Sequence, residues 1–417
     1  MEFLKTLLCV YVSILLVHCA TQQNATIEIL YPSSEVLKRD VKFLASDELE
    51  GRGTGEEGEK RAAEYIAQRM QSLGLKPMGT MGYYQDFAVK DRNNPHDQTF
   101  AAAGDISVRN VIGYLDNGAP TTVVIGGHYD HLGYEHPGSL HMDGRAIHNG
   151  ADDNASGVAG FLYLAEALKS AYRGNNYLII GFSGEEYGLW GSNYFTKNPT
   201  IPLASINYML NLDMVGRLNS EGKLSINGVG TSPEWKSAMK RIKVKGISTV
   251  TTESGMGASD HTSFYTSGIP AIHFFTGQHE DYHRPSDDEE KINYLGLEKV
   301  LKYMLELIEE LDDDGRITYT ETKDADQQTR RSFAVTLGVM PDYLFEGEGM
   351  RIDGVRHDRP AQKAGIVKGD IVIRMGEFDV VDMESYMNLL SKFQPGQTIP
   401  VLIDRDGTKL ERTVTFD

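Results

Sequence analysis

Apolar residues recur every three or four positions near the start of the folded part of the chain. This spacing predicts helices from about residue 33 to residue 75, with a break at the glycine-rich stretch 51–55. Gly74 and Pro77 supply the stop signals at the end of the second helix. The apolar positions of that helix are Ala62, Ile66, Met70 and Leu73.

Further along, short apolar runs alternate with longer segments of helical periodicity. The runs predict strands at residues 110–115, 122–125, 177–182, 206–212 and 271–275. The longer segments predict helices at residues 158–172 and 295–311. Because such alternation is typical of parallel sheets covered on both faces, the sequence predicts an α/β fold: a mostly parallel, mixed central sheet with helices on both faces.

Residues 313–331 are polar and charged and lack apolar periodicity, which predicts a linker between two domains. The first domain would cover residues 33–312, and the second would cover residues 332–417. The second is predicted to be small and β-rich, with strands at 371–375, 399–403 and 412–416 and a turn at 404–407.

Composition narrows the classes of function. A length of 417 residues, at about 150 residues per domain, agrees with two or three domains. The 41 Lys and Arg residues against 59 Asp and Glu residues give a net charge of -18. This excess of acid argues against a broad phosphate-binding surface, so no nucleic-acid partner is expected. Both cysteines, Cys9 and Cys19, lie in the first 19 residues. Any metal in the domains that follow must therefore be bound by His, Asp or Glu.

Residues 1–19 are typical of an export signal. Lys5 precedes a short apolar run at residues 7–17, which is too short to span a bilayer comfortably. Leu16-Val17-His18-Cys19 resembles a bacterial lipobox in which Cys19 would be acylated, although His18 stands where a small residue is usual. We therefore expect an exported protein in the bacterial periplasm, or a lipoprotein with a lipid anchor to a membrane, with secretion as the alternative.

Polar side chains gather where the predicted strands end. Because loops beyond the carboxyl ends of parallel strands converge on one crevice, residues far apart in the sequence can meet there. Each motif alone is more often structural than catalytic, and it is their order and placement that indicate a site. The motifs are His128-Tyr129-Asp130, Asp152-Asp153-Asn154, Ser183-Gly184-Glu185-Glu186, Asn211-Leu212-Asp213 and Tyr282-His283.

These motifs contain a set of imidazole and carboxylate groups suited to zinc. The proposed ligands are His128, Asp153, Glu186, Asp213 and His283. If Asp153 bridges two ions, each ion has three protein ligands and room remains for a shared water. Without metal the clustered carboxylates would repel one another, so two divalent cations would also stabilise the site.

Two neighbouring residues are candidates for the chemistry itself. Glu185 could take a proton from a metal-bound water and pass it to the leaving amine. Tyr282 is a candidate hydrogen-bond donor to the oxyanion of a tetrahedral intermediate.

Other polar residues could orient the proposed ligands. Asp130 is placed to accept the second ring N–H of His128, and Asp287 could do the same for His283. His131 is close to these residues in the sequence but is given no role.

From residue 34 to residue 311, this set closely resembles the co-catalytic dizinc aminopeptidases of metallopeptidase family 28. The likeness extends to the flanking stretches 49–54, 109–114 and 259–264. It implies two Zn²⁺ per chain: one bound by His128 and Asp213, the other by Glu186 and His283, with Asp153 bridging them. It also implies that Glu185 is the general base and that Tyr282 stabilises the oxyanion.

The C-terminal segment resembles a PDZ domain of the kind attached to bacterial proteases. The likeness lies in Leu337-Gly338-Val339, in the stretch 359–365 and in Lys368-Gly369-Asp370. Such domains bind an extended peptide as an added strand, so a peptide or protein C-terminus is the expected partner near Leu337 and Gly338. A fused domain with an unused groove is the alternative.

Together these features predict a zinc-dependent exopeptidase that removes residues from peptide N-termini. The preference for an aminopeptidase over a carboxypeptidase rests on the resemblance alone, because Arg217 and Arg284 cannot be placed from the sequence. Two other functions remain open: a single-zinc glutaminyl cyclase, and a non-catalytic PDZ peptide-binding protein. The retention of His128 and Asp130 argues for two metals and against the cyclase.

Overall fold

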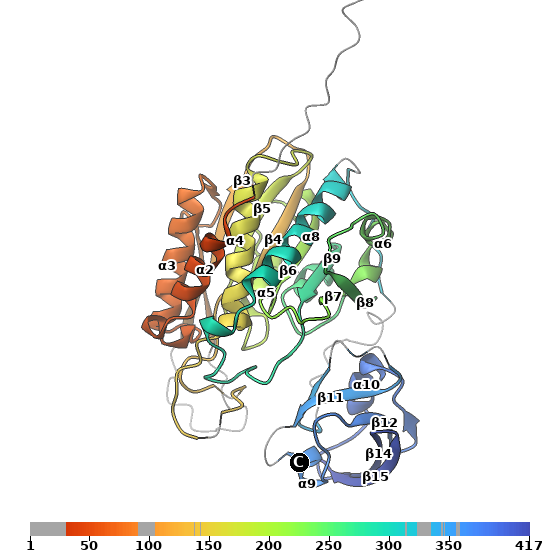
Figure 1. The fold of residues 1–417 in the computed structure, drawn as a ribbon. Helices are drawn as coiled ribbons and strands as arrows, with labels where there is room; N and C mark the ends of the chain where they lie inside the picture. Colours follow the sequence, from red (N-terminus) through yellow and green to blue (C-terminus); the bar gives the residue numbers. More distant parts are fainter. Residues whose placement is uncertain are drawn as a thin grey trace, which may run out of the picture.

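The computed structural model describes residues 31–90, 105–136, 138–141, 143–312, 315–322, 335–342, 345, 347–355 and 359–417. These residues form an N-terminal part with a large central sheet and a smaller C-terminal part (Figure 1). The predicted export signal at residues 1–19, with Cys9 and the lipobox at Cys19, lies outside the described residues. Within the described ranges, no helix combines the length and the apolar character needed to cross a membrane.

A mixed sheet of nine strands, counted over the described residues, is the centre of the N-terminal part. The strands are β1 (Lys76–Pro77), β2 (Tyr84–Lys90), β3 (Asp105–Leu115), β4 (Thr122–His128), β5 (Asn176–Phe182), β6 (Ile206–Leu212), β7 (Lys223–Asn227), β8 (Ser248–Thr252) and β9 (Ala271–Phe275). Their order is β1-β3-β5-β4-β6-β9-β7-β8, with β2 paired to β3. The central strands β5, β4, β6 and β9 are parallel, and β3 and β7 join them antiparallel on either side. The predicted mixed sheet is confirmed.

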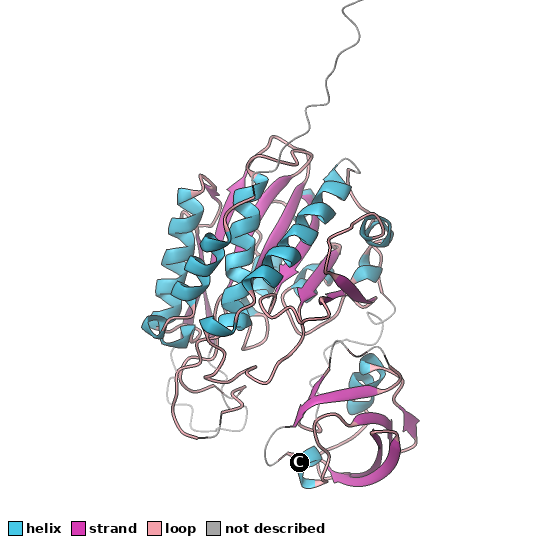
Figure 2. Ribbon diagram, viewed as in Figure 1, coloured by secondary structure: helices cyan, strands magenta, loops and turns pink. Residues whose placement is uncertain are grey.

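Helices cover both faces of this sheet, as the sequence predicts (Figure 2). The alternation of side chains along β4 shows why both faces must be covered. Val123 and Ile125 pack into one apolar cluster, whereas Val124 packs into another with Phe195 and Phe264. The first cluster is covered by α2 (Ser34–Leu44), α3 (Glu57–Ser72), α4 (Gly157–Leu168), α6 (Pro233–Met239) and α8 (Tyr294–Asp312). The second is covered by α5 (Trp190–Lys197) and α7 (His261–Tyr265).

The parallel strands bring the predicted motifs to one edge of the sheet. His128 is the last residue of β4, and Asp213 directly follows β6. Glu185 and Glu186 lie just beyond β5, and Asp153 lies in η2 (Ala151–Ser156), immediately before α4. His283 follows β9 in a long loop. Because these strands share one direction, their carboxyl ends meet, as expected for an open α/β sheet.

The C-terminal part is a small antiparallel sheet with two short helices, which confirms the predicted β-rich domain. Over the described residues its order is β10-β11-β12-β14-β15, with β13 paired to β12. The turn at 404–407 closes the β14–β15 hairpin, and both central residues, Asp406 and Gly407, have positive φ, as a two-residue hairpin loop requires. The elements are β10 (Val339–Pro341), β11 (Met350–Val355), α9 (Pro360–Lys363), β12 (Ile371–Met375), β13 (Phe378–Asp379), α10 (Met383–Leu390), β14 (Thr398–Arg405) and β15 (Thr408–Thr415).

Part of the predicted linker packs against the first domain. Ile317 is buried, and the Arg316 guanidinium donates to the carbonyl oxygen of Ile206 at 2.8 Å. The Thr322 backbone N–H donates to the Tyr265 hydroxyl at 2.9 Å. These residues of the predicted linker therefore contact the first domain through side-chain and backbone groups, which polarity along the chain does not reveal. Residues 313–314 and 323–331 of the predicted linker lie outside the described residues.

Candidate metal centre

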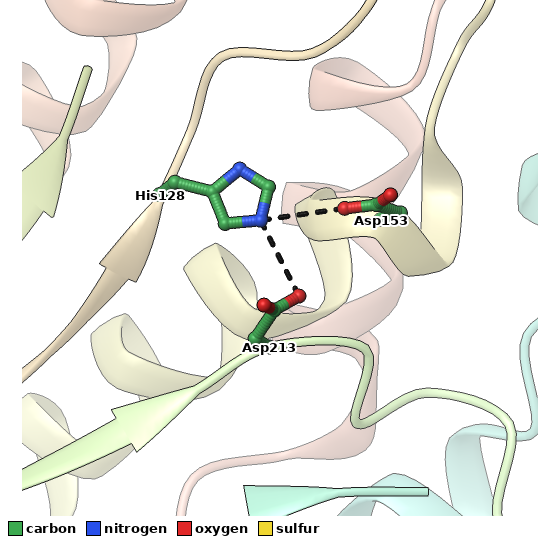
Figure 3. Close-up of side chains that lie close together, drawn as sticks. All are labelled: His128, Asp153 and Asp213. Carbon is green, nitrogen blue, oxygen red and sulfur yellow. Dashed lines mark hydrogen bonds and ion pairs between the residues drawn. The ribbon is translucent and has the colours of Figure 1, made fainter. Parts of the chain in front are cut away.

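His128 lies between two carboxylates at the end of β4 (Figure 3). Its Nε2 atom is 3.3 Å from Asp153 Oδ1 and 3.3 Å from Asp213 Oδ1. The three side chains come from the end of β4, the segment before α4 and the end of β6, and they point toward one another. All three are largely buried. This arrangement is one half of the predicted centre.

The other oxygen of Asp153 faces a second set of groups. Asp153 Oδ2 is 3.2 Å from His283 Nε2, and the same nitrogen is 3.4 Å from Glu186 Oε2. Asp153 therefore stands between His128 and His283, and each of its carboxylate oxygens is directed toward one of them. The structure brings all five proposed ligands together.

The spacing of these atoms fits a metal of zinc's size. Ligand atoms at about 2.0–2.1 Å from a tetrahedral ion lie roughly 3.3 Å from one another. The observed separations of 3.2–3.4 Å between imidazole nitrogens and carboxylate oxygens match that value. Neutral imidazoles and carboxylates are also the ligand types that zinc accepts. The donor set and its spacing thus suit such an ion on both sides of Asp153.

Glu185 joins the same cluster without being one of the five proposed ligands. One oxygen of Glu185, one nitrogen of His128 and one oxygen of Glu186 all lie within 4.8 Å of one another. Burial raises the pKa of Glu185 well above its usual value, and the charges of Glu186 and Asp213 raise it further. Glu185 is thus a buried carboxyl group beside the proposed ligands, within reach of a water held there, which is the position that a general base needs.

The remaining pKa values also show a crowded set of acids. Burial raises the pKa of Glu186 to about 8, and Asp153 adds to this effect while His283 opposes it. Burial alone would lower the pKa of His128, but the carboxylates of Asp213 and Asp153 raise it well above its usual value. Protons must therefore be held between these groups when no cation is bound, and a divalent cation would replace them.

Comparison with known proteins identifies the N-terminal part. Residues 110–308 match the model of Peptidase family M28, and residues 321–416 match that of the PDZ domain. The chain carries a peptidase family M28 domain. A PDZ domain follows it, so both resemblances predicted from the sequence are confirmed.

Curated relatives match the M28 domain only in part. Aminopeptidase YwaD of Bacillus subtilis is 30% identical over 167 residues, which covers 37% of this chain and 36% of the relative. A probable leucine aminopeptidase of Arthroderma otae is 35% identical over 164 residues, covering 37% of this chain and 42% of the relative. The alignments thus span less than half of each of these two proteins.

Solved structures show the same fold over the whole domain. A zinc aminopeptidase from Bacillus subtilis aligns with a TM-score of 0.54 at 19% identity, covering 71% of this chain and 100% of that chain. A glutaminyl cyclase from Fimbriiglobus ruber aligns with a TM-score of 0.56 at 19% identity, covering 70% of this chain and 99% of that chain. Two different chemistries are therefore found on the fold of the M28 domain.

His131 is a member of the cluster that sequence reasoning left without a role. Its Nδ1 atom is 2.8 Å from Glu186 Oε1 and 3.8 Å from Asp153 Oδ2, and the side chain is fully buried. His131, Asp153 and Glu186 form a further group that could hold an ion. The available signal was its position three residues after His128, which carries it past the strand end toward Glu186. A second imidazole thus stands on the same side of Asp153 as His283.

Asp130 contacts His128 through a different group from the one predicted. The Nδ1 atom of His128 is 3.1 Å from the backbone carbonyl oxygen of Asp130, while the carboxylate oxygen Oδ1 is 3.8 Å away. The carboxylate instead accepts from the Thr54 hydroxyl at 2.7 Å and from the Glu185 backbone N–H at 3.2 Å. Asp130 therefore orients His128 with its main chain and uses its side chain to hold the Glu185 loop.

Asp287 is not the partner of His283, which corrects that prediction. The Nδ1 atom of His283 is 2.9 Å from the Gly138 carbonyl oxygen. Asp287 Oδ2 accepts the backbone N–H groups of Asp152 at 3.0 Å and Asp153 at 3.1 Å. The reason is geometric, since the chain turns after His283 and carries Asp287 beneath the Asp153 loop.

Tyr282 stacks on its neighbour. The Tyr282 and His283 rings have centroids 3.8 Å apart and an interplanar angle of 22°. His283 has a positive φ of 54°, a strained conformation for a residue with a side chain, of a kind often found at functional sites. The tyrosine ring is thus packed on one of the proposed ligands of the M28 domain.

Proposed function

We propose that this chain is a zinc-dependent aminopeptidase that binds two Zn²⁺ and removes residues from the N-termini of peptides. The observation that supports this most is the position of Asp153, whose two oxygens lie 3.3 Å from His128 and 3.2 Å from His283. A carboxylate shared in this way suits a pair of ions. His128 and Asp213 would hold one ion, and His283 and Glu186 the other.

The residues of the chain supply the positioning and the proton transfers. Zinc bound at this centre would polarise the scissile carbonyl group and lower the pKa of water. Glu185 accepts a proton from the attacking water and returns it to the leaving amine. Tyr282, packed on His283, donates a hydrogen bond to the oxyanion. Asp130 holds the Glu185 loop in place through the backbone N–H of Glu185.

A peptidase assay with a metal cycle tests this function. The purified chain is stripped with a chelator and assayed against a panel of amino-acid arylamides before and after zinc is returned. We expect loss of hydrolysis on stripping and recovery with about two zinc equivalents per chain. A substrate of this panel with an acetylated N-terminus should not be cleaved. Equal turnover of the acetylated and the free substrate would contradict an aminopeptidase.

Glutaminyl cyclisation is the second candidate, because glutaminyl cyclases share the fold at similar TM-scores. The two functions differ in their metal content and their product. A cyclase of the single-zinc kind would bind one tightly held ion and form pyroglutamate from an N-terminal glutamine. Metal analysis and mass spectrometry of a Gln-initiated peptide separate them, since an aminopeptidase releases free glutamine instead.

We also propose that the PDZ domain binds a C-terminal peptide. Among the described residues, strand β10 is at the end of the strand order, so its outer edge could take an added strand. Gly338, beside it, has a φ of 71°, a conformation that favours glycine in a tight loop. A labelled peptide with a free C-terminus should bind, and the same peptide with an amidated C-terminus should not.

Export to the periplasm or to a membrane stays a proposal that rests on residues 1–19. Cell fractionation of the wild-type chain and of Cys19→Ala tests it, since an acylated Cys19 would keep the wild type in the membrane fraction and release the variant. Equal soluble recovery of both would contradict the lipid anchor.

A further inference from the structure

Arg52 is a fully buried cation that the proposed reaction does not use. It ends η1 (Asp47–Arg52), and its side chain is 0% exposed. Glu50, Gly51 and Arg52 all have positive φ, at 50°, 73° and 51°. Two of these three residues carry side chains and pay a conformational cost there. The chain is bent sharply to deliver this guanidinium into the interior.

The hydrogen-bond partners of the guanidinium are backbone carbonyl oxygens on separate segments. Nε donates to Tyr129 at 2.8 Å, Nη1 donates to Asn149 at 2.7 Å and also to Leu44, and Nη2 donates to Gly150 at 3.0 Å. Tyr129 directly follows His128, and Gly150 lies three residues before Asp153. One planar group thus joins helix α2 to the two loops that carry these proposed ligands.

The backbone of Gly51 and Arg52 also forms hydrogen bonds with the loop that follows β4. The Arg52 carbonyl oxygen accepts the His131 N–H at 3.0 Å, and the Gly51 carbonyl oxygen accepts the Gly133 N–H at 3.0 Å. A Cβ atom at Gly51 would lie 2.5 Å from the carbonyl oxygen of His148, so glycine is required for this close approach. The segment from Gly51 to Arg52 is built against the loop that follows β4.

The positive charge of Arg52 limits how this residue can affect metal binding. In the described structure the acceptors of Arg52 are all carbonyls, so its charge is not neutralised by a directly bound carboxylate. Burial lowers the pKa of Arg52 to about 10, which still leaves it charged at neutral pH. A fixed positive charge near the centre repels a metal cation and would weaken its binding. The same charge also favours the ionised form of nearby carboxylates, among them Asp153 and Glu186. Because these two electrostatic effects oppose each other, the hydrogen bonds from Arg52 to the loops are the contribution that the geometry supports.

We propose that Arg52 is a positioning residue for the metal centre, which sets the positions of His128 and Asp153 by gathering the backbone carbonyls beside them. This inference rests on the proposed function, because it needs a metal centre to position. It predicts that the several N–H donors of the guanidinium matter more for zinc affinity than its charge does. Arginine offers five N–H donors in a rigid plane, whereas lysine keeps the charge but cannot reach several separate acceptors at once.

Two variants and one control test the proposal with the full chain. Arg52→Lys keeps the charge and loses the planar fork, and Arg52→Met loses both. Arg69→Met is the matched control, because Arg69 is 12% exposed, lies in the same domain and pairs with Asp40 at 3.1 Å without contacting a ligand loop. The measurements are the zinc dissociation constant, from competition with a chelator, and the urea midpoint of the metal-free chain.

We expect Arg52→Lys and Arg52→Met each to weaken zinc binding by at least about tenfold. Arg69→Met should lower the urea midpoint while zinc binding stays within about twofold of wild type. If Arg52→Met does not fold, the zinc affinity of Arg52→Lys decides alone. Three results would overturn the proposal: wild-type zinc affinity in Arg52→Lys, tighter zinc binding in Arg52→Met, or an equal loss of zinc in Arg69→Met.

The same data separate this inference from the proposed function. If the wild type binds zinc but cleaves no peptide, the aminopeptidase fails while the role of Arg52 is still measured by zinc affinity. If the wild type binds no zinc, both fail, because no centre exists to be positioned.

Discussion

Replacing Glu185 with glutamine changes one proton acceptor and one charge at nearly constant volume. The neighbouring contacts should survive, because the Asp130 carboxylate holds the backbone N–H of Glu185 and not its side chain. The five proposed ligands are untouched. Glu185→Gln therefore tests the general base separately from the metal centre.

The substitution should change both the rate of hydrolysis and the stability of the metal-free chain. Loss of a general base costs about 10²–10⁴ in rate, so hydrolysis should fall at least about a hundredfold. Carboxylate oxygens of Glu185 and Glu186 lie within 4.8 Å of each other. Two full charges at that distance repel by about 3.5 kcal/mol at an effective dielectric of about 20. Protonation relieves part of this repulsion in the wild type, so the metal-free variant should be more stable by about 1–3 kcal/mol.

The assay combines kinetics, metal analysis and urea unfolding of the chelator-stripped chain. We expect kcat to fall, zinc content to stay at the wild-type value, and the unfolding free energy of the metal-free chain to rise. Glu280→Gln, an exposed residue of the loop before His283, is the control and should change none of these. Retained hydrolysis would refute the assignment of Glu185 as the general base. An unchanged or lower unfolding free energy in the metal-free variant would refute the proposed repulsion between Glu185 and Glu186.

Three further predictions concern the surroundings of the centre. Asp153→Asn should lower bound zinc below two equivalents by metal analysis, since an amide cannot bridge two cations well; two retained ions would contradict the bridge. Asp287→Ala should leave the buried N–H groups of Asp152 and Asp153 unpaired and cost about 2–4 kcal/mol in urea unfolding, and an unchanged midpoint would show that Asp287 does not hold this loop. Burial raises the pKa of Glu59 from 4.5 to about 8, so the folded chain keeps a proton that the unfolded chain releases. Stability should then fall as pH rises from about 4.5 to about 8, by roughly 5 kcal/mol at about 1.4 kcal/mol per unit. Glu59→Gln should remove this contribution and make the pH dependence of urea unfolding shallower, and an identical slope in both proteins would contradict it.

Much of the fold was predictable because apolar periodicity is a local property. The buried strands β6 and β9 begin and end at the predicted residues, 206–212 and 271–275, since each is a short and mostly apolar run. The extent of β3 was underestimated, because its first residues pair with β2 at the sheet edge and carry no strong apolar signal. The contacts of residues 316–322 with the first domain were not predictable, because they join polar groups that lie far apart along the chain.

Residue types and short-range patterns were enough to identify the side chains that could bind a metal and to place them at strand ends. Which atoms face each other depended on how distant segments pack together. In the folded chain, the carbonyl and not the carboxylate of Asp130 lies beside His128. The Asp287 carboxylate accepts a backbone N–H of the Asp153 loop. His131 contacts Glu186. Arg52 likewise contacts carbonyls 77 to 98 residues away along the chain. Hydrogen-bond partners depend on distances of a few tenths of an ångström between distant segments, and packing of the whole domain sets those distances.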